Sequence, residues 1–102
     1  MVFKNFTPHN IVLNDGREFA SEGLARVSSE HTAFSEDGVC EVVFGEVSGL
    51  PEPVEGTMLI VSALVAQAAK RGDVVSPATG HPQTVRNEKG HIVSVPGFVR
   101  AV

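Results

Sequence analysis

Tryptophan and tyrosine are absent from this sequence of 102 residues, and its only aromatic residue is phenylalanine, which occurs six times. Tryptophan and tyrosine commonly anchor large protein interfaces, so their absence disfavours an extensive aromatic docking surface. Cysteine occurs once, as Cys40, which excludes an internal disulfide and is typical of a reducing compartment. Because no helix start or cation adjoins Cys40, we expect its side chain to be a small buried hydrophobe within a strand.

Long apolar segments and basic clusters are also missing. No apolar run approaches the roughly 20 residues that cross a bilayer, and the first residues contain no apolar core of signal-peptide length. We therefore expect a cytoplasmic protein that does not engage a membrane. The formal net charge is −4, and the only adjacent basic pair is Lys70-Arg71, so nucleic-acid binding is disfavoured.

Signatures of metal and cofactor sites are lacking as well. The four histidines, His9, His31, His81 and His91, are separated by 22, 50 and 10 residues, which matches no short zinc motif. The sequence contains no glycine-rich phosphate loop. We expect neither a metal nor a cofactor, and the pattern alone assembles no catalytic set of residues.

What is present is typical of a folded globular chain. Hydrophobic residues make up 42% of the sequence and charged residues 20%. A chain of this length can fold without disulfides, and we expect residues 1–102 to form one domain. Turn signals ending in glycine occur at residues 14–16, 35–38 and 87–90, each flanked by residues typical of strands. The sequence therefore predicts three β-hairpins.

A strand, a helix and a second strand are predicted between the last two hairpins. Residues 57–61 form an unbroken apolar run, as in strands covered on both faces. Ser62 is a candidate N-cap for an alanine-rich helix over residues 63–70, and residues 73–76 resume an extended pattern. The predicted fold class is α+β: a small mixed, mainly antiparallel sheet built from hairpins, with one packed helix.

The sequence also predicts which side chains of this helix are buried and where the helix ends. The side chains assigned to the buried face are Leu64, Val65, Ala68 and Ala69. Lys70 and Arg71 complement the negative end of the helix dipole, and Gly72 is expected to take the left-handed conformation that ends the helix. Free N–H groups at the helix start favour anions, but without phosphate-loop glycines a plain N-cap at Ser62 is the better interpretation.

Three segments together resemble a known group of proteins. They are Asn5-Phe6-Thr7-Pro8-His9-Asn10-Ile11, the strand Ala25-Arg26-Val27-Ser28, and residues 49–66 with the sequence GLPEPVEGTMLIVSALVA. The resemblance is to short proteins encoded by phages, prophages and some bacteria, and it covers almost the whole chain. It implies a phage or prophage setting, and hence the host cytoplasm, but no particular activity.

The segment Thr7-Pro8-His9-Asn10 gathers a hydroxyl, an imidazole and an amide at the mouth of a predicted strand. Pro8 favours an extended Thr7 and stiffens the approach, so Thr7, His9 and Asn10 are candidate ligand-binding residues. The alternative is a strand-initiating turn in which Thr7 and Asn10 satisfy local backbone groups.

Arg26 and Ser28 complete the candidate ligand-binding site. Side chains two residues apart in a strand share a face, and an arginine there can grip a carboxylate or phosphate with a serine hydroxyl beside it. The alternative is that both lie on the solvent-facing side of an antiparallel sheet.

Three functions remain open from these patterns. The first is a non-enzymatic binding protein of phage or prophage type that engages a host protein or sequesters a small anionic, nucleotide-like ligand, in a counter-defence role. The second is a small hydrolase or transferase acting on a nucleotide or ADP-ribose-like substrate, with His9 as general base and Arg26 as electrostatic clamp. The third is a structural or virion-associated subunit that forms a homo-oligomer through an exposed sheet edge. The lack of a recognisable nucleophile and base favours the first.

Overall fold

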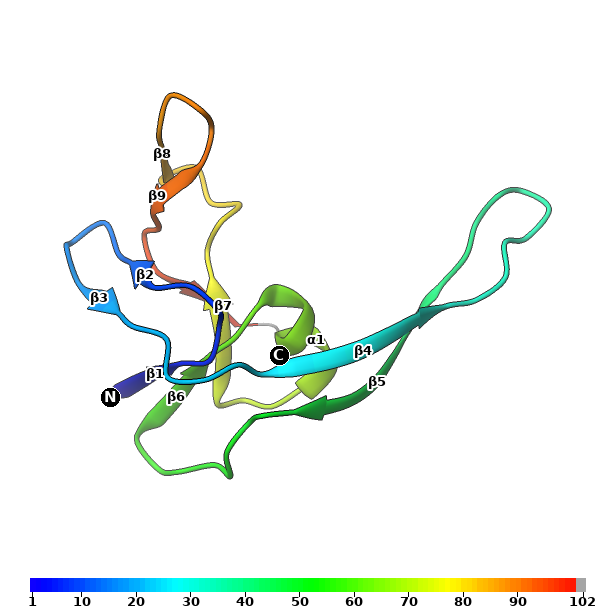
Figure 1. Ribbon diagram of the computed structural model, residues 1–102, viewed down its shortest axis with the longest axis horizontal. Coiled ribbons are helices and arrows are strands. Elements are labelled where there is room, and N and C mark those ends of the chain that lie inside the picture. The colour runs from blue at the N-terminus through cyan, green and yellow to red at the C-terminus, as the bar shows by residue number, and fades with distance from the viewer. Residues whose placement is uncertain (101–102) are drawn as a thin grey trace.

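A computed structural model describes residues 1–100, which contain one short helix and ten strands (Figure 1). The elements in chain order are β1 Val2–Asn5, β2 Ile11–Val12, β3 Glu18–Phe19, β4 Arg26–His31, β5 Val42–Ser48, β6 Thr57–Ile60, α1 Ala63–Ala69, β7 Val74–Pro77, β8 Val85–Arg86, β9 Ile92–Ser94 and β10 Phe98–Val99. A four-stranded sheet in the order β1-β6-β7-β10 is accompanied by the hairpins β2–β3, β4–β5 and β8–β9. The predicted α+β class is confirmed.

The four-stranded sheet is mixed. Strand β6 lies between β1 and β7 and is parallel to both, whereas β10 is antiparallel to β7. Strands β6 and β7 with α1 between them are the expected strand–helix–strand unit. The sequence pattern did not predict β1, because its four residues, VFKN, carry no turn signal and pair with a strand far along the chain.

Both faces of the four-stranded sheet are covered, as the unbroken apolar run at residues 57–61 predicts. One face packs Met58, Ile60 and Val75 against Ile11, Leu13 and Val95, with Phe3, Phe19 and Phe98 at the margin. The other face packs Leu59, Val61 and Val74 against Ala25, Val65 and Ala66. Helix α1 therefore covers one face of the sheet, and the β2–β3 hairpin covers the other.

All three predicted hairpins form. Their turns contain Gly16, Gly38 and Gly90, whose backbone φ angles are 94°, 81° and 80°. Residues other than glycine rarely adopt such positive φ angles. In the first turn the backbone N–H of Arg17 donates to the Asp15 carboxylate at 3.0 Å. This bond, together with the Arg17 guanidinium, lowers the pKa of Asp15 from its ordinary value.

Helix α1 begins where predicted, because the Ser62 hydroxyl accepts a hydrogen bond from the Val65 N–H at 3.3 Å. The predicted buried face is wrong at Leu64, which is 46% exposed, whereas Val65 and Ala66 are buried. The small side chain of Ala66 is completely covered and lets the helix backbone approach the sheet closely. That rotation of the helix turns Leu64 towards solvent.

The predicted helix end is also wrong. Lys70 rather than Gly72 takes the left-handed conformation, with φ of 50°, and its N–H donates to the Ala66 carbonyl at 3.3 Å. The helix ends early because the chain must turn back for β7 to pair with β6 from Val74 onwards. Within residues 1–100 no helix is long and apolar enough to cross a membrane.

The β4–β5 hairpin projects from the rest of the molecule, and we call residues 26–48 the arm (Figure 1). The molecule extends over 48 × 38 × 21 Å with a radius of gyration of 15.3 Å, against about 13 Å for a compact chain of this length. Cys40 lies near the tip of the arm, outside the strands and only half-buried. The expectation of a buried strand cysteine is therefore wrong, because this loop has no core to enter.

Gly49 provides a test of the arm's attachment. It has φ of 86° directly after β5, and a Cβ there would collide with the Leu24 carbonyl oxygen, whereas Gly38 has φ of 81° with open space around it. We expect Gly38→Ala to cost about 1 kcal/mol for the left-handed backbone alone. Gly49→Ala should cost roughly 3 kcal/mol or more, because the collision adds to that strain. Urea denaturation of both variants measures the difference, and equal losses would contradict the close approach.

Candidate ligand-binding cleft

The side chain of Asn5, at the end of β1, is completely buried and uses all of its hydrogen-bonding capacity. Its amide Nδ2 donates to the carbonyl oxygens of His9 at 2.7 Å and Phe19 at 2.9 Å. Its Oδ1 accepts from the backbone N–H of Thr7 at 2.9 Å and lies 2.7 Å from the Thr7 hydroxyl. One side chain thus joins β1, the loop after it and β3.

The Thr7 side chain is drawn into the same network. Its hydroxyl oxygen lies 2.7 Å from Asn5 Oδ1 and 3.0 Å from the His9 carbonyl oxygen, so its single proton is shared between two acceptors. The carbonyl of Thr7 accepts from the Ser21 hydroxyl at 2.6 Å. The Thr7 side chain is buried, and its hydrogen-bonding groups are used within the chain. Thr7, one of the five residues predicted from the sequence to bind a ligand, therefore holds the loop in place.

This loop borders a cleft at one edge of the four-stranded sheet. Because β1, β6 and β7 are parallel, their carboxyl ends lie together, and Thr7, Ser62 and Thr79 follow those three ends. Crevices at the carboxyl ends of parallel strands are common ligand sites. The cleft has a volume of about 500 Å³, within the range of small-molecule pockets. Its lining residues are Thr7, Pro8, His9, Asn10, Ile11, Val12, Ser62, Ala63, Pro77, Thr79, Ile92, Val93, Ser94 and Val95.

Aliphatic and proline side chains form most of this lining, and the polar groups among them are hydroxyls, one amide and one imidazole. His9 and Asn10 are exposed at the cleft, and no hydrogen bond of the His9 ring occurs within residues 1–100. Neither lysine nor arginine belongs to the lining. The cleft is therefore suited to a ligand with an apolar body and a few hydrogen-bonding groups.

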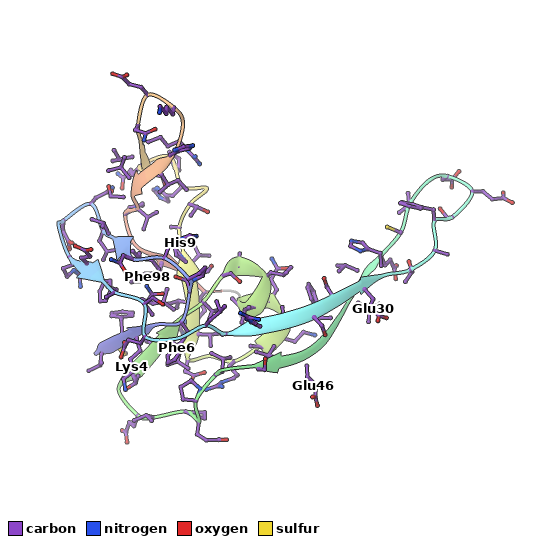
Figure 2. The ribbon with its side chains drawn as sticks, in the orientation of Figure 1. Lys4, Phe6, His9, Glu30, Glu46 and Phe98 are labelled. Carbon is purple, nitrogen blue, oxygen red and sulfur yellow. The ribbon has the colours of Figure 1, made fainter. Side chains whose placement is uncertain are left out.

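Arg26 and Ser28 do not line the cleft. Both lie on β4, which within residues 1–100 pairs with β5 alone, and both side chains are exposed to solvent. The Ser28 hydroxyl stands over Gly45, where a Cβ would collide with it. Figure 2 shows His9 on the body of the molecule and Glu30 and Glu46 along the arm. The expectation that the five candidate residues form one site is thus corrected: only Thr7, His9 and Asn10 share a cleft.

Several residues of this cleft were not singled out from the sequence as ligand-binding. Thr79 and Ser94 lie in or beside segments interpreted as connectors and strands, and their place depends on which strands are parallel. The structural role of Asn5 was not predicted, because an asparagine within a strand does not by itself indicate a buried hydrogen-bond network. The available signal was the spacing Asn5-x-Thr7, which suits a side chain bonding to the backbone two residues on.

In residues 1–100 no three or more His, Cys, Asp or Glu side chains are grouped so that they could hold a metal ion.

Comparison with known proteins yields no relative. No protein-family model matches the chain, and no curated protein or solved structure is significantly similar to it. The function therefore has to be argued from the geometry of the chain itself.

Asn5 offers a direct test of the network beneath the cleft. Asn5→Ala leaves the buried Thr7 N–H without its partner and removes one donor each from the His9 and Phe19 carbonyls, although the Thr7 hydroxyl can still donate to His9. Each buried group left unpaired costs about 1–3 kcal/mol, and the lost packing of the buried side chain adds to that cost. We expect a loss of roughly 3 kcal/mol or more in the free energy of unfolding, measured by urea denaturation. Asn10→Ala is the matched control and should cost about 0.5 kcal/mol or less, because Asn10 is exposed and its hydrogen bonds to Glu18 at 3.4 Å and from the Ser21 N–H at 3.3 Å are long and open to solvent. Similar losses for both variants would contradict the role given to Asn5.

Proposed function

We propose that this chain is a non-enzymatic binding protein whose cleft, at the carboxyl ends of β1, β6 and β7, receives a small ligand. The observation that carries the proposal is that the cleft wall is held rigid before any ligand arrives. The buried Asn5 side chain fixes the loop that presents His9 and Asn10. A binding surface fixed in advance loses little conformational entropy on binding.

The chemistry of the lining favours a neutral, flat, partly apolar ligand such as a nucleobase or nucleoside. Ile11, Val93 and Pro77 offer apolar surface, while the hydroxyls of Thr79 and Ser94 offer hydrogen bonds. The anionic part of a nucleotide would find no cation in the lining. In a nucleotide-like ligand, the base and sugar would therefore supply the affinity and the phosphate would face solvent.

Binding is better supported than turnover for this cleft. General acid–base catalysis of hydrolysis or transfer usually needs two positioned groups, or a nucleophile beside a base. The lining has one imidazole, from His9, and within residues 1–100 none of the hydroxyls in the lining is hydrogen-bonded to that ring. The carboxylates and thiol of these residues lie elsewhere. Arg26, the other residue considered for such a mechanism, is on the arm. In a phage or prophage setting, a protein of this kind would sequester a host signalling molecule.

The test is calorimetric titration of the full chain with the four ribonucleosides and their 5′-monophosphates. We expect heat with at least one nucleoside, and no gain in affinity from the phosphate. His9→Ala and Thr79→Val should each weaken that binding about three- to tenfold, as expected for loss of one hydrogen bond. His31→Ala removes an exposed imidazole from the arm and serves as the matched control.

Two results would contradict this proposal. The first is absence of heat with all eight compounds at millimolar concentration. The second is binding that His31→Ala weakens as much as His9→Ala does, because that would place the ligand away from the cleft.

A further inference from the structure

The molecule exposes more surface than a compact chain of its mass. Its accessible surface is 6878 Å². A folded monomer of 10.8 kDa is expected to expose about 5,500 Å². The excess of about 1,300 Å² is larger than the roughly 800 Å² that one partner buries in a standard interface. The arm projects furthest from the body, and the β2–β3 and β8–β9 hairpins also project (Figure 1).

The arm is a two-stranded sheet that packs on the body only at its base. There Val27 and Val47 contact the cluster that includes α1. Further out, the strands have no third strand on either edge within residues 1–100, and Phe34 and Val42 are 73% and 45% exposed. A lone two-stranded hairpin is only marginally stable in water, so the outer arm lacks the support its length requires.

One face of the arm is continuous with the core. This face carries the pairs Val27–Val47, Ser29–Phe44 and His31–Val42. Side chains alternate along each strand, and the one extra residue that the bulge inserts in β5 between Val47 and Phe44 keeps both on the same face. At its base the face is covered by α1. Beyond the base, the half-buried Phe44 and the exposed Val42 continue this face. The opposite face carries Glu30 and its partner Val43, which is 55% exposed, and Figure 2 shows Glu30 and Glu46 pointing away from the arm.

Charge is distributed unevenly between the arm's tip and its base. Glu36, Asp37 and Glu41 give the tip three negative charges with no lysine or arginine near them in the sequence. Beside the base is a groove of about 380 Å³, lined by Gly45, Glu46, Val47, Leu50, Ala68, Ala69 and Arg71. Lys70, at the end of α1, is exposed and lies outside both ion pairs formed within residues 1–100. The tip is thus acidic. Beside the base, Lys70 is an exposed cation outside these ion pairs, and the groove combines leucine and alanine side chains with Glu46 and with Arg71, which is paired with Asp73.

We infer that the arm packs against the arm of a second copy of this chain, antiparallel about a two-fold axis. In that arrangement the tip of each arm reaches the base of the other, so that Phe34 enters the partner's groove and Glu36 and Asp37 approach the partner's Lys70. Phe44 and Val42 cover their counterparts in the middle. A two-fold interface must be self-complementary, and an acidic tip that meets the exposed Lys70 beside the partner's base satisfies that condition.

A second copy suits these features better than another occupant. An unrelated acidic partner would be repelled by the tip, and a purely basic partner would leave Lys70 unmatched. On the β5 side, the apolar residues Val47, Phe44 and Val42 also lead outward from the core along one face, as expected when each arm shields the other. The inference concerns the arm alone and does not depend on ligand binding in the cleft.

Sedimentation velocity of the full chain tests the inference. The wild type should sediment with twice its chain mass of 10.8 kDa at micromolar concentration. The double substitution Glu36→Lys with Asp37→Lys should raise the dimer Kd about tenfold or more, and Lys70→Glu should do the same, because each brings like charges together. A chain carrying all three substitutions should regain the dimer. Glu88→Lys, at the tip of the β8–β9 hairpin, is the matched control and should leave the dimer unchanged.

Thermal melts followed by circular dichroism check that each variant is folded, and the recovery in the triple variant makes the result independent of any single loss of stability. A wild type that stays monomeric at 100 μM overturns the inference. So does a dimer that survives both charge reversals, or a triple variant that fails to recover. Dimers that form only when a basic protein is added would point to a different occupant and would also overturn it.

Discussion

The buried side chain of Asn5 is the constraint on which the body of this protein depends. An amide in an apolar interior is stable only if all of its donors and acceptors are matched, and here the partners come from two separate stretches of chain. The loop of residues 6–10 and the end of β3 are consequently held at fixed positions relative to β1. The position of the cleft wall depends chiefly on this residue, with further support from the Ser21 hydroxyl, although Asn5 itself does not line the cleft.

Local signals were sufficient for the parts of the fold that form locally. The glycine turns predicted all three hairpins, and Ser62 with the apolar run before it predicted the start of α1. Such features depend on the backbone preferences of a few neighbouring residues. The end of the helix was predicted less well, because the demand that β7 align with β6 moved the left-handed residue to Lys70.

The candidate site was only partly predictable for a related reason. Thr7, His9 and Asn10 are neighbours in the sequence, so their gathering was visible there. Their meeting with Ser62 and Thr79 depends on β1 lying parallel to β6, a long-range pairing that no local pattern encodes. Arg26 was expected to lie near these residues, but nothing local in its strand pattern shows which sheet the strand joins. Within residues 1–100, β4 pairs with β5 alone and projects from the body.

The pairing of β1 with β6 also has a consequence for synthesis on the ribosome. Val2 meets Thr57, so the first strand must wait for more than half of the chain before it has a partner. Hairpins close within microseconds once their two strands are available, whereas contacts between distant segments form late. The β2–β3 and β4–β5 hairpins can therefore close while the N-terminal strand is still unpaired, but a lone hairpin is only marginally stable. The base of the arm packs on Val61, Val65 and Val74, so the arm gains lasting support only when β6, α1 and β7 assemble.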